Sequence, residues 1–186
     1  MIAVIGLGFV GLTTGLGLAH ITGHTVYGYD INERKRATLL KGQIPFYEPS
    51  LQEHLELYHK EQRFHICATM EEAVQQADII FFCVGTPAQD SGEADLSYLK
   101  TAIASCLKYV KKSEGTLLVI KSTVPPSTTS KVILPTIESL GFTVGKDIGL
   151  VNNPEFLREG FAWDDFIHPD RIVIGECHDE SGEVLE

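Results

Sequence analysis

The sequence predicts an α/β fold in which helices cover both faces of a doubly wound, mainly parallel β-sheet. An apolar, β-branched run at residues 1–5 leads directly into a glycine-rich turn, as a first strand would. Strand-type and helix-type segments then alternate along the chain. Residues 79–84 are apolar without interruption, which is typical of a strand buried on both faces of a parallel sheet. Together these patterns favour a parallel, doubly wound architecture.

The glycine-rich turn has the spacing G-x-G-x-x-G over residues 6–11, and a helix-compatible segment follows at residues 12–21. In such a turn the first glycine permits the bend, the second lets the backbone approach a pyrophosphate, and the third allows close helix–strand packing. The helix N-terminus offers N–H groups to an anion. The motif therefore predicts a Rossmann-like dinucleotide site, the alternative being a glycine-rich β-turn beside a solvated aspartate. The residues expected to contact the dinucleotide here are Gly6, Gly8, Phe9, Val10 and Gly11.

An acidic residue ends the second predicted strand, residues 24–29. Asp30 lies 19 residues after Gly11, close to the spacing of the acid that binds a ribose 2′-hydroxyl. A carboxylate there repels a 2′-phosphate, so the predicted cofactor is NAD rather than NADP. Lys35, one helical turn further on, is within reach of the adenosine side of the cofactor; the alternative is a solvated helix cation.

The remaining elements follow from periodicity, capping signals and Pro or Gly breaks. Three N-caps are predicted: Asn32, a capping box from Ser50 to Glu53, and a second capping box from Thr69 to Glu72. Ser127 or Thr128 is expected to cap a further helix, which runs to about residue 140. The other predicted helices span residues 32–41, 50–61, 69 onward and 96–110, and the other predicted strands span 64–67, 78–84, 116–120, 148–151 and 171–174.

Polar residues follow several of the predicted strands. In an open α/β sheet, ligands bind beyond the carboxyl ends of the strands. The residues Thr86, Thr123, Glu155 and Glu159 are therefore expected to gather on the cofactor side. For Thr86 a plain turn residue is the alternative, and for Glu155 it is an acid that caps a helix after Pro154.

Composition narrows the classes of function. The 186 residues are expected to form one domain, and the net charge of −10 argues against nucleic acid or an anionic membrane as partners. No apolar stretch reaches transmembrane length, and the first residues have no cationic lead typical of a signal peptide. Widely spaced cysteines and the absence of histidine ligand spacing predict reduced thiols in a cytoplasmic protein and no metal site. The four cysteines are Cys67, Cys83, Cys106 and Cys177.

Several stretches together resemble the N-terminal NAD-binding domain of the UDP-glucose/GDP-mannose dehydrogenases, the nucleotide-sugar 6-dehydrogenases. Two of them are far more specific than the glycine motif: K-S-T-V-P-P at residues 121–126 and N-P-E-F-L-R-E-G at residues 153–160. The other matching stretches are G-L-G-F-V-G-L at 6–12, Y-D-I-N at 29–32, P-F-Y-E-P at 45–49, V-G-T-P at 84–87 and P-D-R-I-V-I-G at 169–175.

The resemblance implies oxidation of the sugar C6 alcohol to a carboxylate by two NAD⁺, through a thiohemiacetal and a thioester on a cysteine. It implies a UDP-glucose or GDP-mannose type of substrate and a homo-oligomeric full-length enzyme. Residues 8–10, Asp30, Lys35, Thr86, Thr123 and Glu159 would contact NAD, and Thr123 and Glu155 would orient the catalytic water. The nucleotide-sugar would be held by Glu155, Phe156, Leu157, Arg158 and Glu159.

The sequence also departs from the family pattern. Ser50 and Ser127 stand where the family usually has glycine, and both are explained as helix caps. Gly15 and Gly17 are unusual inside a helix and are expected to let it approach the sheet closely. No cysteine has the neighbours of the family's G-x-C-x-P-K-D nucleophile. Residues 1–186 are therefore expected to be a single cofactor domain without the family's central helix and C-terminal UDP-binding domain, and inactive alone.

Two other functions are compatible with part of the sequence. The first is a stand-alone NAD-binding or assembly module without catalysis. The second is the cofactor domain of a β-hydroxyacid dehydrogenase, which shares the glycine motif but not the stretch at residues 153–160. This stretch favours the nucleotide-sugar enzymes, because a bare dinucleotide module has no use for it.

Overall fold

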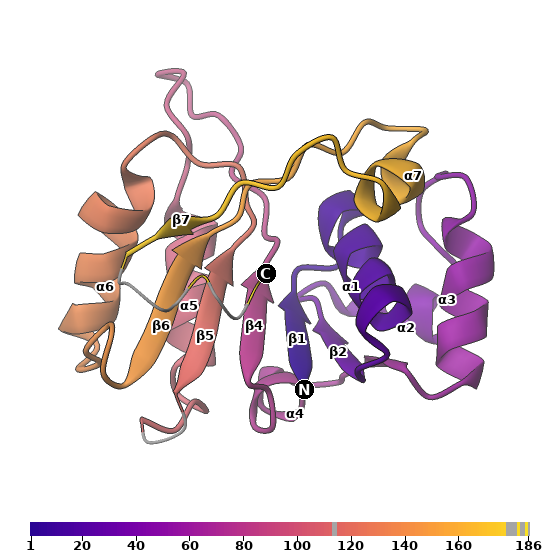
Figure 1. Ribbon diagram of the computed structural model, residues 1–186, viewed down its shortest axis with the longest axis horizontal. Coiled ribbons are helices and arrows are strands. Elements are labelled where there is room, and N and C mark those ends of the chain that lie inside the picture. Colours follow the sequence, from indigo (N-terminus) through magenta and orange to yellow (C-terminus); the bar gives the residue numbers. More distant parts are fainter. Residues whose placement is uncertain (113–114, 178–181, 183–184, 186) are drawn as a thin grey trace.

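The computed structural model describes residues 1–112 and 115–177, together with 182 and 185. The described residues form one seven-stranded sheet in the order β3-β2-β1-β4-β5-β6-β7 (Figure 1). All neighbouring strands are parallel except β6 and β7, which pair antiparallel. The strands are β1 (Ile2–Ile5), β2 (Val26–Tyr29), β3 (Phe64–Ile66), β4 (Ile79–Phe82), β5 (Thr116–Ile120), β6 (Ile148–Asn152) and β7 (Gly175–Glu176). The chain thus winds outward in both directions from β1 and β4, and the predicted doubly wound α/β class is confirmed.

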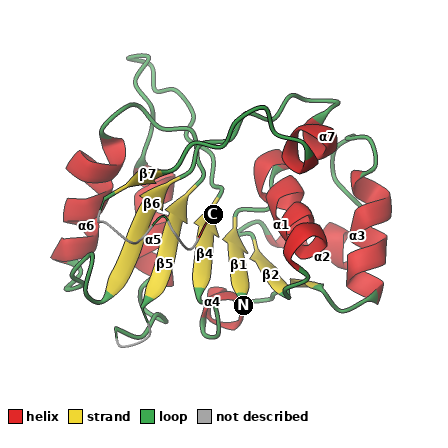
Figure 2. Ribbon diagram, in the orientation of Figure 1, coloured by secondary structure: helices red, strands yellow, loops and turns green. Residues whose placement is uncertain are grey.

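Helices cover both faces of the sheet (Figure 2). The helices are α1 (Phe9–Thr22), α2 (Glu33–Leu40), α3 (Leu51–Lys60), α4 (Met70–Val74), α5 (Ser97–Cys106), a π-helical turn η1 (Thr129–Ile133), α6 (Leu134–Ser139) and α7 (Ala162–Ile167). Alternate strand residues point to opposite faces, so β4 sends Ile80 to one core and Phe81 to the other. The first core lies against α4, α5 and α6, and the second lies against α1, α2 and α3.

Most predicted elements are present, but the chain end differs from the prediction. Residues 171–174 are not a strand; the last strand is the two-residue β7, which lies antiparallel to β6. The amide of Asn153 donates a 2.9 Å hydrogen bond to the carbonyl of Val173, so a side chain and not a strand partner holds this extended return segment. The structure also adds α7, a helix that the sequence did not predict. The helix predicted from residue 96 to 110 ends earlier, at Cys106.

The helix after β5 is interrupted. Its first helical residue is Thr129, so Thr128 occupies the N-cap position as predicted, but no side chain makes a cap hydrogen bond there. Its first turn is π-helical and passes into α6 at Leu134. Pro135 explains the irregularity, because its ring lacks an N–H donor and collides with the carbonyl one turn earlier in a regular α-helix. The prediction of an uninterrupted helix was wrong for this reason.

Ser50 and Ser127, the two serines expected to act as helix caps, both adopt left-handed backbone conformations. Ser50 has φ 64° and Ser127 has φ 67°. Ser50 makes no side-chain cap, so the capping box predicted from Ser50 to Glu53 is wrong, whereas the Asn32 cap and the box from Thr69 to Glu72 are confirmed. Both serines therefore occupy positions where a glycine would be relaxed.

Replacing these serines with glycine is expected to stabilise the protein. Each of Ser50→Gly and Ser127→Gly should raise the free energy of unfolding by about 0.5–1 kcal/mol, because relief of left-handed strain exceeds the added entropy of the unfolded chain. Urea unfolding followed by circular dichroism measures the change. Ser130→Gly, inside η1, is the matched control and should lower stability by about 0.5 kcal/mol. A loss of stability in both test variants would contradict the strain argument.

The two helix glycines of α1 have separate roles. A β-carbon on Gly15 would lie 2.6 Å from the ring of Phe64 in β3, so this glycine does allow close approach to the sheet. A β-carbon on Gly17 would instead lie 2.3 Å from the ring of Phe166 in α7. The expectation of close helix–sheet packing is thus confirmed for Gly15, whereas Gly17 makes room for α7.

Candidate cofactor and substrate site

The glycine turn joins β1 to α1 and has the shape that the motif predicts. Gly6 has φ 94° and its amide donates to the carbonyl of Tyr29 at 2.8 Å. A β-carbon on Gly11 would lie 1.7 Å from the carbonyl oxygen of Gly6, so only glycine permits this packing. A β-carbon on Gly8 would meet nothing within 4 Å. The protein's own packing therefore does not require Gly8, and the space beside it is open to a ligand.

The N-terminus of α1 faces this open space without a side chain that neutralises it. Gly8 is the N-cap residue, no side chain caps the helix, and its first turn contains no acid. The first amide bonded within the helix is that of Leu12, which donates to the carbonyl of Gly8 at 2.9 Å. The amides of the first turn and the positive end of the helix dipole therefore suit a pyrophosphate.

Asp30 lies at the carboxyl end of β2, beside the glycine turn, and only 5% of it is exposed. Its carboxylate accepts hydrogen bonds from the amides of Leu7 (2.8 Å) and Asn32 (2.9 Å). The ammonium of Lys35 donates to Oδ2 at 2.6 Å. These bonds fix the carboxylate next to the turn and bring Lys35 to the same edge of the site. Oδ1 accepts only the bond from Asn32 and therefore retains acceptor capacity for a ribose hydroxyl.

Two of the predicted polar residues meet beyond β4 and β5. The hydroxyl of Thr86 donates to the carbonyl of Thr123 at 2.6 Å. The neighbouring Ser122 hydroxyl donates to the carbonyls of Phe82 (3.2 Å) and Val84 (2.7 Å), which ties the two strand ends together. Both threonines are solvent-accessible and lie on the carboxyl side of the sheet. The structure thus brings Thr86 and Thr123 together, as predicted.

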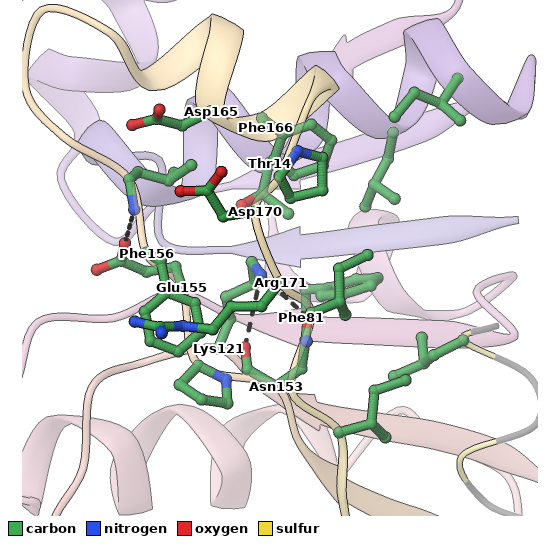
Figure 3. Close-up of a pocket in the computed structure, with 18 of the residues that line it drawn as sticks. Thr14, Phe81, Lys121, Asn153, Glu155, Phe156, Asp165, Phe166, Asp170 and Arg171 are labelled. Carbon is green, nitrogen blue, oxygen red and sulfur yellow. Dashed lines mark hydrogen bonds between the residues drawn. The ribbon is translucent and has the colours of Figure 1, made fainter.

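Residues 154–160 leave β6 as a loop without helical structure. Glu155 accepts a hydrogen bond from the amide of Leu157 at 2.6 Å, so it closes a local turn and does not cap a helix. Arg158 binds Asp165 of α7 through Nε at 3.1 Å and a terminal nitrogen at 2.6 Å. Glu155, Phe156, Leu157 and Arg158 line a cavity of about 610 Å³, and Glu159 and Thr123 are not part of its lining. Figure 3 shows Glu155 and Phe156 in this lining.

A buried lysine lies in the wall of the same cavity. Lys121 is 8% exposed, and its ammonium donates to the side-chain oxygen of Asn153 at 3.0 Å. Burial lowers the pKa of Lys121, while the charge of Glu155 acts in the opposite direction. Figure 3 shows Lys121, Asn153 and Glu155 close together at the foot of the cavity. The lysine thus anchors the start of the 154–160 loop.

Sequence reasoning missed both Lys121 and Glu48 as site residues. Both occur inside stretches that matched the family, but nothing local distinguishes them from solvated charges. Glu48 is 5% exposed and accepts hydrogen bonds from the amides of Gly160 (2.8 Å) and Ala162 (2.9 Å). Its partners are 112 and 114 residues away along the chain, so only the folded structure identifies them.

The cysteines are poor nucleophiles where they lie. Burial raises the pKa of Cys83 and Cys106 to about 12 and that of Cys67 to about 11. Burial also raises the pKa of the half-buried Cys177. Since the thiolate is the reactive form, a raised pKa disfavours reaction of each of these thiols near neutral pH.

The described residues form neither a cluster of metal ligands nor a membrane-spanning helix. Within the ranges 1–112 and 115–177 and the two further positions, no group of three or more His, Cys, Asp or Glu side chains is placed to hold a metal ion. In the same part of the chain, no helix has the length and apolar character needed to cross a membrane.

Comparisons with known proteins agree with this geometry. The model of the UDP-glucose/GDP-mannose dehydrogenase family's NAD-binding domain matches residues 1–186. A UDP-glucose 6-dehydrogenase of Rickettsia felis is 41% identical over 184 residues, covering 99% of this chain and 39% of that protein. A ternary complex of GDP-mannose dehydrogenase from Pseudomonas aeruginosa has a TM-score of 0.94 and 36% identity, covering 100% of this chain and 43% of that one.

A third relative gives the same picture. The structure of a UDP-glucose dehydrogenase from Pyrobaculum islandicum has a TM-score of 0.89 and 38% identity, covering 99% of this chain and 42% of that one. The chain therefore spans about two fifths of the length of these relatives. The matched part is the part that binds NAD in this family, and NAD is the cofactor that the glycine turn and Asp30 suit. The chain belongs to the UDP-glucose/GDP-mannose dehydrogenase family and forms its NAD-binding domain.

Proposed function

We propose that this domain serves a nucleotide-sugar 6-dehydrogenase that oxidises the C6 alcohol of a UDP-glucose or GDP-mannose type of substrate. The observation that carries the proposal is the 154–160 loop, whose residues line a cavity beside the buried Lys121. A domain that only bound NAD would need the glycine turn and Asp30, but no cavity lined by this loop. The relatives named UDP-glucose and GDP-mannose dehydrogenases support the choice of substrate class.

The cofactor's pyrophosphate would lie on the backbone of Gly8, Phe9 and Val10, and its adenosine ribose would bind Asp30 beside Lys35. Bound NAD⁺ would supply a hydride acceptor. Thr86, Thr123 and Glu159 complete the proposed contacts with the cofactor. Thr123 and Glu155 would orient the water that hydrolyses the thioester, and residues 155–159 would hold the nucleotide-sugar.

We further propose that residues 1–186 bind NAD⁺ but give no turnover by themselves. The described thiols are buried or have raised pKa values, and none has the neighbours of the family's nucleophile. Purified chain with NAD⁺ and either UDP-glucose or GDP-mannose should therefore produce no NADH, although calorimetry should detect NAD⁺ binding. Steady NADH formation would contradict the need for a further cysteine.

A chimera tests the catalytic proposal itself. Residues 1–186 would replace the matching segment of the Rickettsia felis relative, which is longer than this chain. The chimera should reduce NAD⁺ in the presence of UDP-glucose. Glu155→Gln should lower kcat of the chimera at least about tenfold. Loss of a general base typically lowers the rate by about 10²–10⁴-fold, and loss of a group that only orients the water should cost less. The matched control Glu138→Gln, on the exposed end of α6, should leave kcat unchanged. A chimera that binds NAD⁺ but oxidises neither nucleotide-sugar would favour the non-catalytic module.

A further inference from the structure

The loop at residues 42–50 contacts both halves of the proposed site. At one point the ring of Phe46 packs edge-on against Phe9 of the glycine turn, with centroids 6.2 Å apart. Two residues later Glu48 binds the far end of the 154–160 loop. Phe46 and Glu48 therefore connect the cofactor turn to the loop that lines the cavity.

Glu48 holds that loop with its whole carboxylate. One oxygen accepts from the amide of Gly160 and the other from the amide of Ala162, the first residue of α7. The helix has no side-chain cap of its own, so Glu48 supplies one from a distant part of the chain. Among the residues that the structure describes, no ion pair to Glu48 is found. Burial of a carboxylate without a neighbouring cation costs desolvation free energy, and the two charge-assisted hydrogen bonds offset this cost for Glu48.

The 154–160 loop is thus held at both ends by buried charged groups. Lys121 binds Asn153 at its start, and Glu48 binds Gly160 at its end. Between these anchors, the bond from the Leu157 amide to Glu155 is local to the loop, and Arg158 binds Asp165 of the adjoining α7. The guanidinium of Arg171 lies over the exposed ring of Phe156, 4.5 Å from its centroid, and neither contact reaches Gly160. Loss of Glu48 would therefore free the end of the loop together with the start of α7.

We propose that Glu48 is a positioning residue that holds the 154–160 loop and, with Phe46, couples its position to cofactor binding at the glycine turn. NAD⁺ bound at the turn would restrict the motion of the Phe9 side chain. Because Phe9 packs on Phe46, it would also restrict the segment that contains Glu48, and through Glu48 the 154–160 loop. This inference rests on the proposed function, because it needs NAD⁺ at the turn and the nucleotide-sugar at the loop. Glu48 would not touch either reacting group.

The chain contains a built-in reporter for the test. Trp163 is its single tryptophan and directly follows Ala162, the residue that Glu48 caps. Its ring packs on His54 of α3, with centroids 3.6 Å apart, and on His20 of α1 at 5.6 Å. Acrylamide quenching of Trp163 fluorescence therefore measures how firmly α7 and the end of the loop are docked.

The experiment compares the wild-type chain with Glu48→Gln, Glu48→Ala and the control Glu53→Gln, an exposed glutamate on α3. In the wild type, saturating NAD⁺ should lower the quenching constant by about half, because binding orders the loop. Without NAD⁺, the constant should rise about twofold in Glu48→Ala and less in Glu48→Gln, which retains one acceptor oxygen. In Glu48→Ala, NAD⁺ should no longer change the quenching constant of Trp163. The Kd of this variant for NAD⁺ should stay within about threefold of the wild-type value.

A further variant keeps the test decisive if Glu48→Ala does not fold. Phe46→Leu preserves both hydrogen bonds of Glu48. Without NAD⁺, its Trp163 quenching constant should therefore equal that of the wild type, but NAD⁺ should no longer lower this constant. Quenching that is the same in the wild type and both Glu48 variants would overturn the positioning role. An NAD⁺ response retained in Phe46→Leu would overturn the coupling. Failure of the wild-type chain to bind NAD⁺ would instead refute the proposed function, so the two failures are distinguishable.

Discussion

Gly8→Ala is expected to abolish measurable NAD⁺ binding while the protein remains folded. A β-carbon at this position meets no protein atom within 4 Å, so the substitution adds no strain to the fold. It does fill the space where a pyrophosphate would contact the backbone, and a methyl group there displaces the ligand from the helix N-terminus. The affinity should fall at least about 100-fold, since two or more charge-assisted hydrogen bonds are lost.

The matched control is the third glycine of the same motif. In Gly11→Ala the new β-carbon would lie 1.7 Å from a backbone oxygen of Gly6, so the strand–helix junction must move and the fold itself should fail. Calorimetric titration with NAD⁺ and thermal unfolding of both variants separate the two effects. A Gly8→Ala protein that binds NAD⁺ as tightly as the wild type would contradict the placement of the pyrophosphate.

Asp30→Ala is expected to weaken NAD⁺ binding by about 10- to 100-fold and to reduce the preference for NAD⁺ over NADP⁺. The carboxylate would no longer accept from the ribose or repel a 2′-phosphate. Lys35 and Arg36, whose guanidinium donates to the carbonyl of Asp30 at 2.6 Å, would remain nearby as cations for that phosphate. The variant should also be less stable, because the buried amide of Leu7 loses its acceptor.

Asp30→Asn serves as the control, because it keeps an oxygen for the Leu7 amide but removes the charge. It should recover most of the lost stability and still show the weaker preference for NAD⁺. Titration of each variant with both dinucleotides measures the preference directly. If the Asp30→Ala protein retains the wild-type ratio of the Kd values for NAD⁺ and NADP⁺, the adenosine ribose does not bind at Asp30.

The features predicted correctly from the sequence are those set by local chemistry. The glycine spacing determines a turn whose close contacts, such as that of Gly11 with Gly6, lie five residues apart. Asn32 and Thr69 cap helices through partners three residues away. The continuous apolar run at β4 marks a strand buried in the middle of the sheet. In each case the signal lies within one short window of sequence, although the partners of β4 are strands β1 and β5, which are distant along the chain.

The features that were missed depend on contacts distant in the sequence. Helix α7 is short and lacks a cap of its own, and it receives one from Glu48 more than a hundred residues earlier. Lys121 looks like an ordinary cation until β5 and β6 pair and bring Asn153 beside it. Ser50 shows the opposite error: its residue type suggested a cap, but the tertiary turn imposes a left-handed backbone that prevents one.

The central claim is that the glycine turn and Asp30 form a site for NAD. Isothermal titration of the 186-residue chain with NAD⁺ and with NADP⁺ tests it most directly. We expect one NAD⁺ bound per chain, with a Kd at least about tenfold lower than that for NADP⁺, since repulsion by one buried carboxylate is worth 1.4 kcal/mol or more. Absence of NAD⁺ binding by the folded chain, or equal affinity for the two dinucleotides, would contradict the claim.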